Sequence, residues 1–520
     1  MDIKKEFERW LVNATADADV AAELKMLDDT KIEDACVDCG LCSKVCPILN
    51  MPEFAYGFIG LANDFVSYAA IIATVFNSVA SRFIANSFYK KDYETANYYF
   101  NSLIAANIAI SAVLGLAGVL LVPNLDKVLS IPASLVFDVK LTFALIFGSY
   151  IISLLTLVFT TSTFVTNRTD IQGIRNIIQY LIRFALVVIF LNFISVRIYW
   201  VALATLIATA VISIMNMSLT KRLTPELKID PSKAKRKYAV ELAKSGSWMA
   251  LTSISTVLLR GLDLTVANIF VGDYEMGLLS IARTIPNNVT SVIATIAPIF
   301  TPVFIAYYAQ DDIAGLTSNV KKTINTMALI LFVPISGFIV FSYDFYALWQ
   351  KSLSSDELML ITMLSTLTVV QAYFNSVTST MAQLSVVVNK LKLPVFVSLG
   401  CGIVSIAAEI VLIKCFGLGL YAIVLSTTVV MIVRYVIFNS LYAAWCLEQP
   451  MTCFLPAALK TWLSIPFLII LMILIRTVLP IHSWMGLGLD AVLAGGLGYA
   501  FMMVIYGRDE LNAILGKLKK

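Results

Sequence analysis

The chain has 520 residues, of which 59% are hydrophobic and only 14% are charged. A soluble domain carries about 25% charged residues, so this composition excludes a soluble globular protein. Many apolar segments exceed the roughly 18 residues that a helix needs to cross a bilayer, and helices are the spanning elements that fit this length. The net charge of +4 is small, and we predict no nucleic-acid partner. The composition therefore predicts an all-α, multi-pass protein embedded in the lipid bilayer.

Residues 1–52 differ from this pattern because they are polar and hold four of the eight cysteines. Cys36, Cys39, Cys42 and Cys46 are followed by a proline and have the spacing of a bacterial ferredoxin run. Such thiolates can hold a 4Fe–4S cluster, but the second cysteine run that usually completes the ligand set does not occur in the sequence. Two interpretations stay open: these cysteines are metal ligands, or the segment is a fragment joined to a membrane protein that requires no cofactor.

The same segment carries two further resemblances. Residues 1–35 resemble the opening of bacterial phosphoglucomutase/phosphomannomutase proteins around Trp10 and Leu11. The loops that carry mutase chemistry do not occur in this chain, so the resemblance implies no mutase activity. Residues 36–50 resemble a ferredoxin module, and the N-terminal segment is therefore interpreted as chimeric.

A long apolar stretch that begins near Glu53 recurs about 220 residues later, from Asp273, with Gly57 aligned on Gly277. A repeat of this length in an apolar chain predicts two homologous helical bundles that face each other, with a substrate site between them. The helix expected before the first copy falls on residues 28–52, which hold charges, cysteines and prolines and cannot cross lipid as a helix. We therefore expect about 13 spans, with the first helix of the first repeat replaced.

Basic residues gather in alternate loops, which should be cytoplasmic because Lys and Arg favour that side. The richest of these loops separates the two halves of the chain. The predicted organisation is an atypical polar segment with the cysteine run at 1–52, an N-terminal helical bundle at 53–219, a basic cytoplasmic linker at 220–240, a second helical bundle at 241–450, and a C-terminal helix pair with a basic tail at 451–520.

Charged residues inside predicted spans are the clearest functional signal, because they are costly in lipid. Six of them are predicted to bind substrate in a basic, water-filled cavity: Asp64, Arg82, Arg260, Asp263, Arg283 and Arg434. Arginine suits a pyrophosphate because its planar fork donates two hydrogen bonds to neighbouring oxygens. Pairing of Arg260 with Asp263, three residues away on one helix face, is an alternative that would only lock helices together. Glu409 is a candidate site for a coupling proton or sodium ion.

The stretches AYGFIGLANDF, NSVASRFIA and KKDYETANYYFNS resemble bacterial O-antigen and polysaccharide flippases of the multidrug/oligosaccharidyl-lipid/polysaccharide (MOP) superfamily. The resemblance covers about residues 53–520. It implies a MATE-like fold and a non-enzymatic transporter in the bacterial cytoplasmic (inner) membrane. The substrate would be an undecaprenyl-pyrophosphate-linked oligosaccharide, turned to the outer leaflet for surface polysaccharide such as lipopolysaccharide O-antigen. A polysaccharide polymerase and glycosyltransferases would be its partners.

Three other functions are compatible with parts of the sequence. One is a multidrug or cation antiporter of the same superfamily, which would favour an acidic, aromatic cavity. Another is a membrane-linked redox protein that uses the cysteine run. The third is an inactive flippase, truncated by the loss of its first helix.

Overall fold

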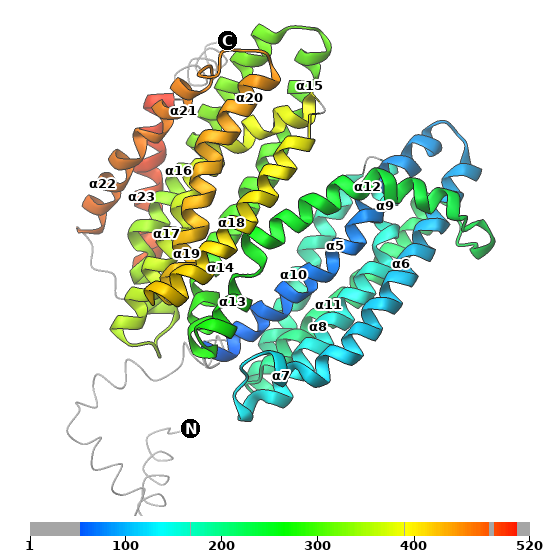
Figure 1. Ribbon diagram of the computed structural model, residues 1–520, viewed down its shortest axis with the longest axis horizontal. Helices are drawn as coiled ribbons and strands as arrows, with labels where there is room; N and C mark the ends of the chain where they lie inside the picture. Colours follow the sequence, from blue (N-terminus) through cyan, green and yellow to red (C-terminus); the bar gives the residue numbers. More distant parts are fainter. Residues whose placement is uncertain (1–52, 167, 389, 478–482, 507–520) are drawn as a thin grey trace, which may run out of the picture. The chain divides into compact units, whose positions relative to one another are not determined.

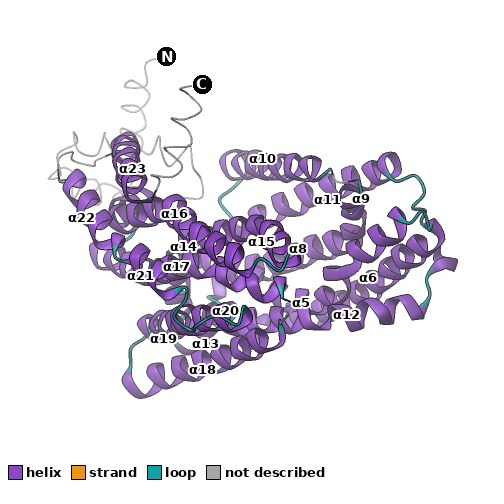
Figure 2. Cartoon of the chain, turned by 90° about the horizontal axis from the view of Figure 1, so that it is seen from above, coloured by secondary structure: helices purple, strands orange, loops and turns teal. Residues whose placement is uncertain are grey.

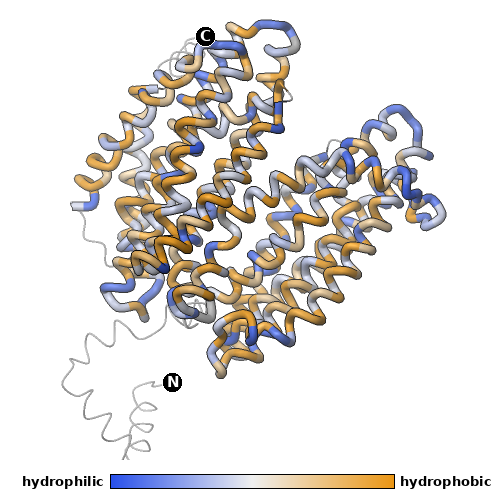
Figure 3. The backbone as a smooth tube through the Cα atoms, viewed as in Figure 1, coloured by the Kyte–Doolittle hydropathy of each residue, from blue (hydrophilic) through white to orange (hydrophobic). Residues whose placement is uncertain are grey.

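The structure, a computed structural model, describes residues 53–166, 168–388, 390–477 and 483–506. Within these ranges the regular elements are all helical (Figure 2). Thirteen helical segments of the described chain are long and apolar enough to cross a membrane. Apolar residues run along the helices, and polar residues gather at their connections (Figure 3). The predicted all-α multi-pass fold with about 13 spans is confirmed.

The first half of the described chain contains the spans that precede the basic segment (Figure 1). Its helices are α5 (Glu53–Tyr89), α6 (Tyr93–Leu121), α7 (Leu125–Val128), α8 (Val136–Thr156), α9 (Thr161–Val165), α10 (Thr169–Phe193) and α11 (Ile198–Leu223). Short 3₁₀ turns join them at η2 (Val122–Asn124), η3 (Ala133–Leu135) and η4 (Leu157–Thr160). Helix α8 packs along α11, and α5 packs against α6 and α8.

The second half begins after the 3₁₀ turn η5 (Pro231–Lys233). Its helices are α12 (Arg236–Thr256), α13 (Asp263–Phe270), α14 (Asp273–Ile296), α15 (Thr301–Ala309), α16 (Ile313–Trp349), α17 (Ser355–Val387), α18 (Lys392–Phe416), α19 (Leu420–Val433), α20 (Ser440–Cys446), α21 (Leu455–Trp462), α22 (Ser464–Arg476) and α23 (Trp484–Tyr506). The π-turns η6 (Val257–Gly261) and η8 (Arg434–Asn439) and the 3₁₀ turn η7 (Ala297–Phe300) lie within spans. Helix α17 packs against α14, α16 and α19.

The repeat seen in the sequence is also found in the backbone conformation of two turns, one after α5 and one after α15. Lys91 and Asp311, which are 220 residues apart, both adopt a left-handed backbone, with φ of 60° and 57°. The next residue caps the following helix in each copy: Asp92 accepts a hydrogen bond from the Thr95 amide at 3.0 Å, and Asp312 does the same for Gly315 at 2.8 Å. The two halves therefore repeat a turn conformation as well as an apolar pattern.

The two copies meet where α5 contacts α14. A Cβ atom on Gly57 would lie 2.8 Å from the Cα of Gly277, the residue that the sequence repeat aligns with it. One turn further, a Cβ atom on Gly60 would lie 2.6 Å from the Oγ of Ser280. Only glycine permits this approach, because contacts below 3.0 Å force neighbouring atoms to move. Equivalent residues of the two repeats thus touch each other across one helix crossing.

Helix α12 lies mainly along α5, while α13 packs against α14. The contact with α5 is close: a Cβ atom on Gly246 would lie 1.9 Å from the carbonyl oxygen of Val75. The span changes direction between these two partners at the π-turn η6, where the regular hydrogen-bond ladder is interrupted. One bent span therefore contacts the leading helices of both repeats.

The basic segment between α11 and α12 is fixed to α6 by side-chain amides. Asn97 donates to the carbonyl of Glu226 and accepts from the amide of Lys228, both at 2.8 Å. Asn101 repeats this pattern one turn later, donating to the Lys228 carbonyl at 2.9 Å and accepting from the Asp230 amide at 2.8 Å. The two asparagines pair with the segment as a neighbouring strand would.

We predict that the double substitution Asn97→Ala and Asn101→Ala releases this segment. The unpaired backbone then becomes accessible, and trypsin should cut after Lys228 several times faster than in the unchanged protein. Limited proteolysis of membrane vesicles, followed by immunoblotting of the two halves, measures the rate. Asn124→Ala is the matched control, because its side chain bonds to near neighbours in the sequence, donating to the Leu120 carbonyl and accepting from Lys127. Equal cleavage rates in all three proteins would contradict the prediction.

Candidate functional site: a buried charge cluster and a buried carboxylate

Arg283 on α14 is the most deeply placed basic side chain of the predicted set that the structure describes. It is only 8% exposed. The neighbouring turn of α14 is held by Tyr346 of α16, which donates to the Ala282 carbonyl at 3.3 Å and to the Ser365 hydroxyl at 2.8 Å. Packing between α14, α16 and α17 therefore fixes the backbone that carries this guanidinium.

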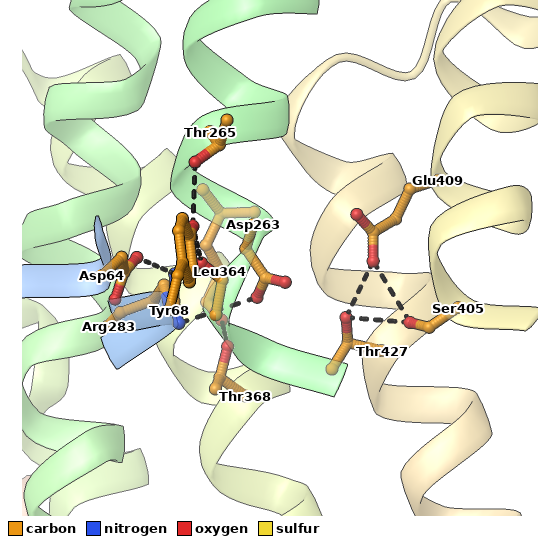
Figure 4. Close-up of polar contacts among 11 residues, drawn as sticks. Asp64, Tyr68, Asp263, Thr265, Arg283, Leu364, Thr368, Ser405, Glu409 and Thr427 are labelled. Atoms are coloured by element: carbon orange, nitrogen blue, oxygen red, sulfur yellow. Dashed lines mark hydrogen bonds and ion pairs between the residues drawn. The ribbon is translucent and has the colours of Figure 1, made fainter. Parts of the chain in front are cut away.

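Two carboxylates from other helices flank Arg283 (Figure 4). The Oδ2 of Asp64 on α5 lies 3.9 Å from Nη1, and the Oδ2 of Asp263 on α13 lies 3.8 Å from Nη2. These distances exceed those of good hydrogen bonds, so the groups interact as loose ion pairs. Arginine donors suit phosphate oxygens, because a charge-assisted bidentate contact is short and directional.

Tyr68 ties α5 to the bent span (Figure 4). Its hydroxyl donates to the carbonyl of Gly261, at the end of η6, and lies 3.0 Å from the hydroxyl of Thr265 on α13. Tyr68 is four residues after Asp64, so both side chains lie on one face of α5. This face of α5 therefore contributes Asp64, which pairs with Arg283, and Tyr68, which holds the span at η6.

Glu409 on α18 forms a second polar group, 1% exposed. Its Oε1 accepts hydrogen bonds from Ser405 at 3.1 Å and from Thr427 of α19 at 3.3 Å (Figure 4). Its Oε2 has no hydrogen-bond partner among the described residues. Glu409 also interacts electrostatically with Asp263 and Arg283. A buried carboxylate with neutral partners and an unused oxygen is suited to holding a proton or a small cation.

The structure brings Arg283, Asp64 and Asp263 together, with Asp263 paired to Arg283. The side chain of Arg260 lies outside the described part of the structure. Arg82 is exposed and lies about 27 Å from Asp64 along α5, at ~1.5 Å per residue, so it does not join the cluster.

Arg434 begins the π-turn η8 in the span that continues from α19. Its guanidinium carbon lies 6.0 Å from the centre of the Tyr435 ring, at the outer limit of a cation–π contact. Its Nε has no hydrogen-bond partner among the described residues. The interruption of the helix at Arg434 matches the one at Arg260, since both begin or lie in π-turns.

Sequence analysis missed Tyr68, Ser405 and Thr427. Two of them had a signal, because Tyr68 follows Asp64 and Ser405 precedes Glu409 by four residues, the spacing of one helix face. Thr427 had none, because it lies on another helix and only the packing of α18 on α19 brings it to Glu409.

The predicted iron–sulfur ligands Cys36, Cys39, Cys42 and Cys46 lie outside the described residues. Within the described ranges, no group of three or more His, Cys, Asp or Glu side chains is arranged to hold a metal ion. The cluster at the N-terminal segment therefore stays a prediction.

Comparisons with known proteins found a matching family and a relative of similar length. The family described as "Polysaccharide biosynthesis protein" matches residues 50–308. The uncharacterized membrane protein EpsK of Bacillus subtilis (strain 168) is 25% identical over 472 residues, which are 90% of this chain and 92% of that protein.

Two kinds of solved structure share the fold. An inward-facing multidrug resistance MATE family transporter of the MOP superfamily has a TM-score of 0.66 at 15% identity, covering 78% of this chain and 93% of the transporter. The lipid II flippase MurJ in an inward closed conformation has a TM-score of 0.61 at 13% identity, covering 88% of this chain and 98% of MurJ.

The fold is therefore MATE-like, and the chain is a multi-pass bacterial membrane protein. The predicted MATE-like fold is confirmed, and the match of residues 50–308 to a polysaccharide biosynthesis family agrees with the resemblance noted in the sequence.

Proposed function

We propose that this protein flips an undecaprenyl-pyrophosphate-linked oligosaccharide from the cytoplasmic to the outer leaflet of the cytoplasmic membrane, for surface polysaccharide synthesis. The match of residues 50–308 to a polysaccharide biosynthesis family carries the proposal. The shared fold with a lipid II flippase supports a lipid-linked substrate. Flipping changes no covalent bond, so the protein acts as a transporter and not as an enzyme. Its partners are the glycosyltransferases that supply the substrate and the polymerase that consumes it.

Arg283 is proposed to bind the pyrophosphate, with Arg260, Arg434 and Arg82 as further contacts along its path. A diphosphate would compete with the two carboxylates for Arg283, because a bidentate contact is shorter and stronger than ion pairs at 3.8 and 3.9 Å. Asp64 and Asp263 hold the guanidinium in place when no substrate is bound. Substrate binding would weaken both pairs and loosen α5 and α13 from α14.

Alternating access requires the α5–α14 contact to open. Gly57 and Gly277 lie at the starts of these helices, the ends that the loop charges predict to face outward. The contact closes that end, so a cavity between the halves would open toward the cytoplasm. Separation of α5 from α14 would then release the head group to the outside.

A disulfide across this contact should lock the transporter. The Cβ position of residue 60 lies 3.7 Å from the Cβ of Ser280, close to the separation of about 3.8 Å in a disulfide. In a background without the native cysteines, Gly60→Cys with Ser280→Cys should cross-link under mild oxidation and lose at least tenfold in flipping rate. A reductant should restore the rate. Each single cysteine is the control, and full flipping by the oxidised double variant would rule out this gate.

Substitution of Arg283 tests the proposed function directly. Arg283→Ala should abolish complementation of a flippase-null strain, and Arg283→Lys should lose at least tenfold in activity, because an ammonium cannot make the bidentate contact. Membrane levels of each variant are compared by immunoblot, since removing Arg283 leaves two carboxylates without this partner.

The matched control is Arg197→Lys, because Arg197 is exposed and pairs with Asp138 at 3.1 Å, outside the cluster. This variant should complement fully. Full complementation by Arg283→Ala at normal membrane levels would contradict the assignment of Arg283 as a substrate ligand.

Glu409 is proposed to bind the coupling proton or sodium ion. Its electrostatic interaction with Asp263 and Arg283 provides a physical link between ion binding and the substrate site. A cation at Glu409 stabilises negative charge at Asp263, which in turn changes how firmly Arg283 is held.

Glu409→Gln should uncouple transport. The amide keeps the size of the side chain but can neither release a proton nor offer two anionic oxygens to sodium. In proteoliposomes, an imposed proton or sodium gradient should no longer accelerate flipping of a fluorescent lipid-linked saccharide, while flipping without a gradient persists. Thr265→Val, on the neighbouring span, should keep the gradient effect. Gradient stimulation that survives in Glu409→Gln would refute the coupling role.

Export of lipophilic cations is a second candidate, and one observation favours it. The described site contains one guanidinium and three carboxylates, an acidic excess that suits a cation. Drug resistance conferred on a pump-deficient strain, without complementation of the flippase-null strain, would select this function over the first.

A further inference from the structure

A separate pocket lies between α8, α10 and α11, and its lining has a different chemistry from the charge cluster. It encloses about 180 Å³. The side chains that line it are hydroxyls, primary amides and two apolar residues, with no carboxylate among them. The described cluster around Arg283 and Glu409 uses none of these helices. This pocket needs an explanation of its own, because polar side chains are costly inside a membrane unless they are paired or functional.

One face of α10 is polar over two turns while the opposite face is apolar. Gln172, Asn176 and Gln179 follow the spacing of one helix face and all line the pocket. Ile177 and Tyr180, on the other side, are large and exposed, as expected for residues that contact lipid. Helix α10 is therefore oriented so that its amides point inward, away from the hydrocarbon.

The facing helices supply hydroxyls that satisfy each other only in part. Thr156 of α8 and Ser213 of α11 share a hydrogen bond of 2.8 Å, and the amide of Gln179 reaches the Thr209 hydroxyl at 3.4 Å. The Oε1 of Gln172 is buried and has no hydrogen-bond partner among the described residues. An unpaired buried oxygen is costly, so the pocket is short of a donor.

Arg175 lies next to the pocket lining, and two of its five N–H donors are engaged. Arg175 is only 7% exposed, donates to the side chain of Asn216 and donates to the Met215 carbonyl at 2.7 Å. Its charge opposes a metal ion or an organic cation in the pocket. Arg175 itself is not among the side chains that line the pocket. The chemistry that remains is that of a neutral ligand rich in hydroxyl or amide groups.

The size and position of the pocket agree with a sugar. Its volume is several times the ~30 Å³ that one water occupies in the liquid, and it is smaller than the sites of drug-sized ligands. Gln172 lies one turn from the start of α10, next to the loop of Arg168, which the charge distribution predicts to be cytoplasmic. The pocket is therefore near the side from which the substrate would enter.

We propose that this pocket between α8, α10 and α11 binds a sugar ring of the lipid-linked oligosaccharide, separately from the pyrophosphate at Arg283. The inference rests on the proposed flippase function and adds a specificity site to it. Gln172 and Asn176 would exchange hydrogen bonds with ring hydroxyl or acetamido groups. The pyrophosphate would supply affinity common to all such lipids, while this pocket would distinguish one saccharide from another.

The test compares two ligands that differ only in the sugar: undecaprenyl pyrophosphate, and undecaprenyl pyrophosphate carrying one N-acetylglucosamine. Full-length protein in nanodiscs should bind the glycosylated lipid about tenfold more tightly, the effect of one or two hydrogen bonds. In the variant Gln172→Leu with Asn176→Leu, this preference should fall to within about twofold, while affinity for the sugar-free lipid stays unchanged. Asn192→Leu is the matched control on α10, since its side chain donates to the Val188 carbonyl of the same helix and does not line the pocket.

A second variant covers the case in which the double substitution fails to fold. Asn176→Cys, in a background without the native cysteines, places a thiol at an accessible position of the pocket. The glycosylated lipid should slow its labelling by a maleimide several-fold, and the sugar-free lipid should not. A sugar preference that survives in the double variant, or one absent from the unchanged protein, overturns the proposal and leaves a pocket filled by water. Binding of neither lipid to the unchanged protein refutes the proposed function itself, and this inference with it.

Discussion

The pairing of one buried guanidinium with two carboxylates is the interaction on which the centre of this protein depends. Arg283, Asp64 and Asp263 come from α14, α5 and α13, so their attraction joins both repeats to the bent span. In a membrane each of these charges alone would be costly, and together they are tolerated. In the proposed mechanism, an anionic head group exchanges with one of these carboxylates at Arg283. The cluster is thus able to hold the helices together and to respond to a substrate.

The charge cluster lies where the two sequence repeats meet. The aligned glycines Gly57 and Gly277 touch, and the turns that follow in each copy share a left-handed residue and an aspartate cap. Helices α5 and α14 cross at these glycines, and a small change of angle at such a crossing can move whole bundles. The π-turns η6 and η8 lie in spans that flank this region and supply places where a helix can change direction.

Two polar environments divide the work of recognition in the proposed mechanism. In that mechanism the guanidinium of Arg283 binds the pyrophosphate, which is common to the proposed substrates. The neutral pocket suits the sugar, which varies among them, because hydroxyls and amides distinguish the arrangement of hydrogen-bonding groups without attracting other ions. Glu409 adds a third element, close enough to Asp263 and Arg283 to influence them electrostatically.

The sequence alone determined the class of this protein. A long apolar segment in a bilayer is stable as a helix, because the helix bonds every backbone polar group within the segment. The repeat could also be aligned residue by residue. The sequence also named Arg283, Asp64 and Asp263, because charges stand out in apolar segments. Only the tertiary structure decided that Asp263 joins Arg283, that Arg82 stays apart, and that Thr427 meets Glu409. The neutral pocket escaped notice because serines, threonines, asparagines and glutamines are tolerated singly in a spanning helix, and their meaning depends on which neighbouring helices they face. Helix periodicity places a side chain on a face, whereas the partner of that face is set by packing over distances that the local sequence does not encode.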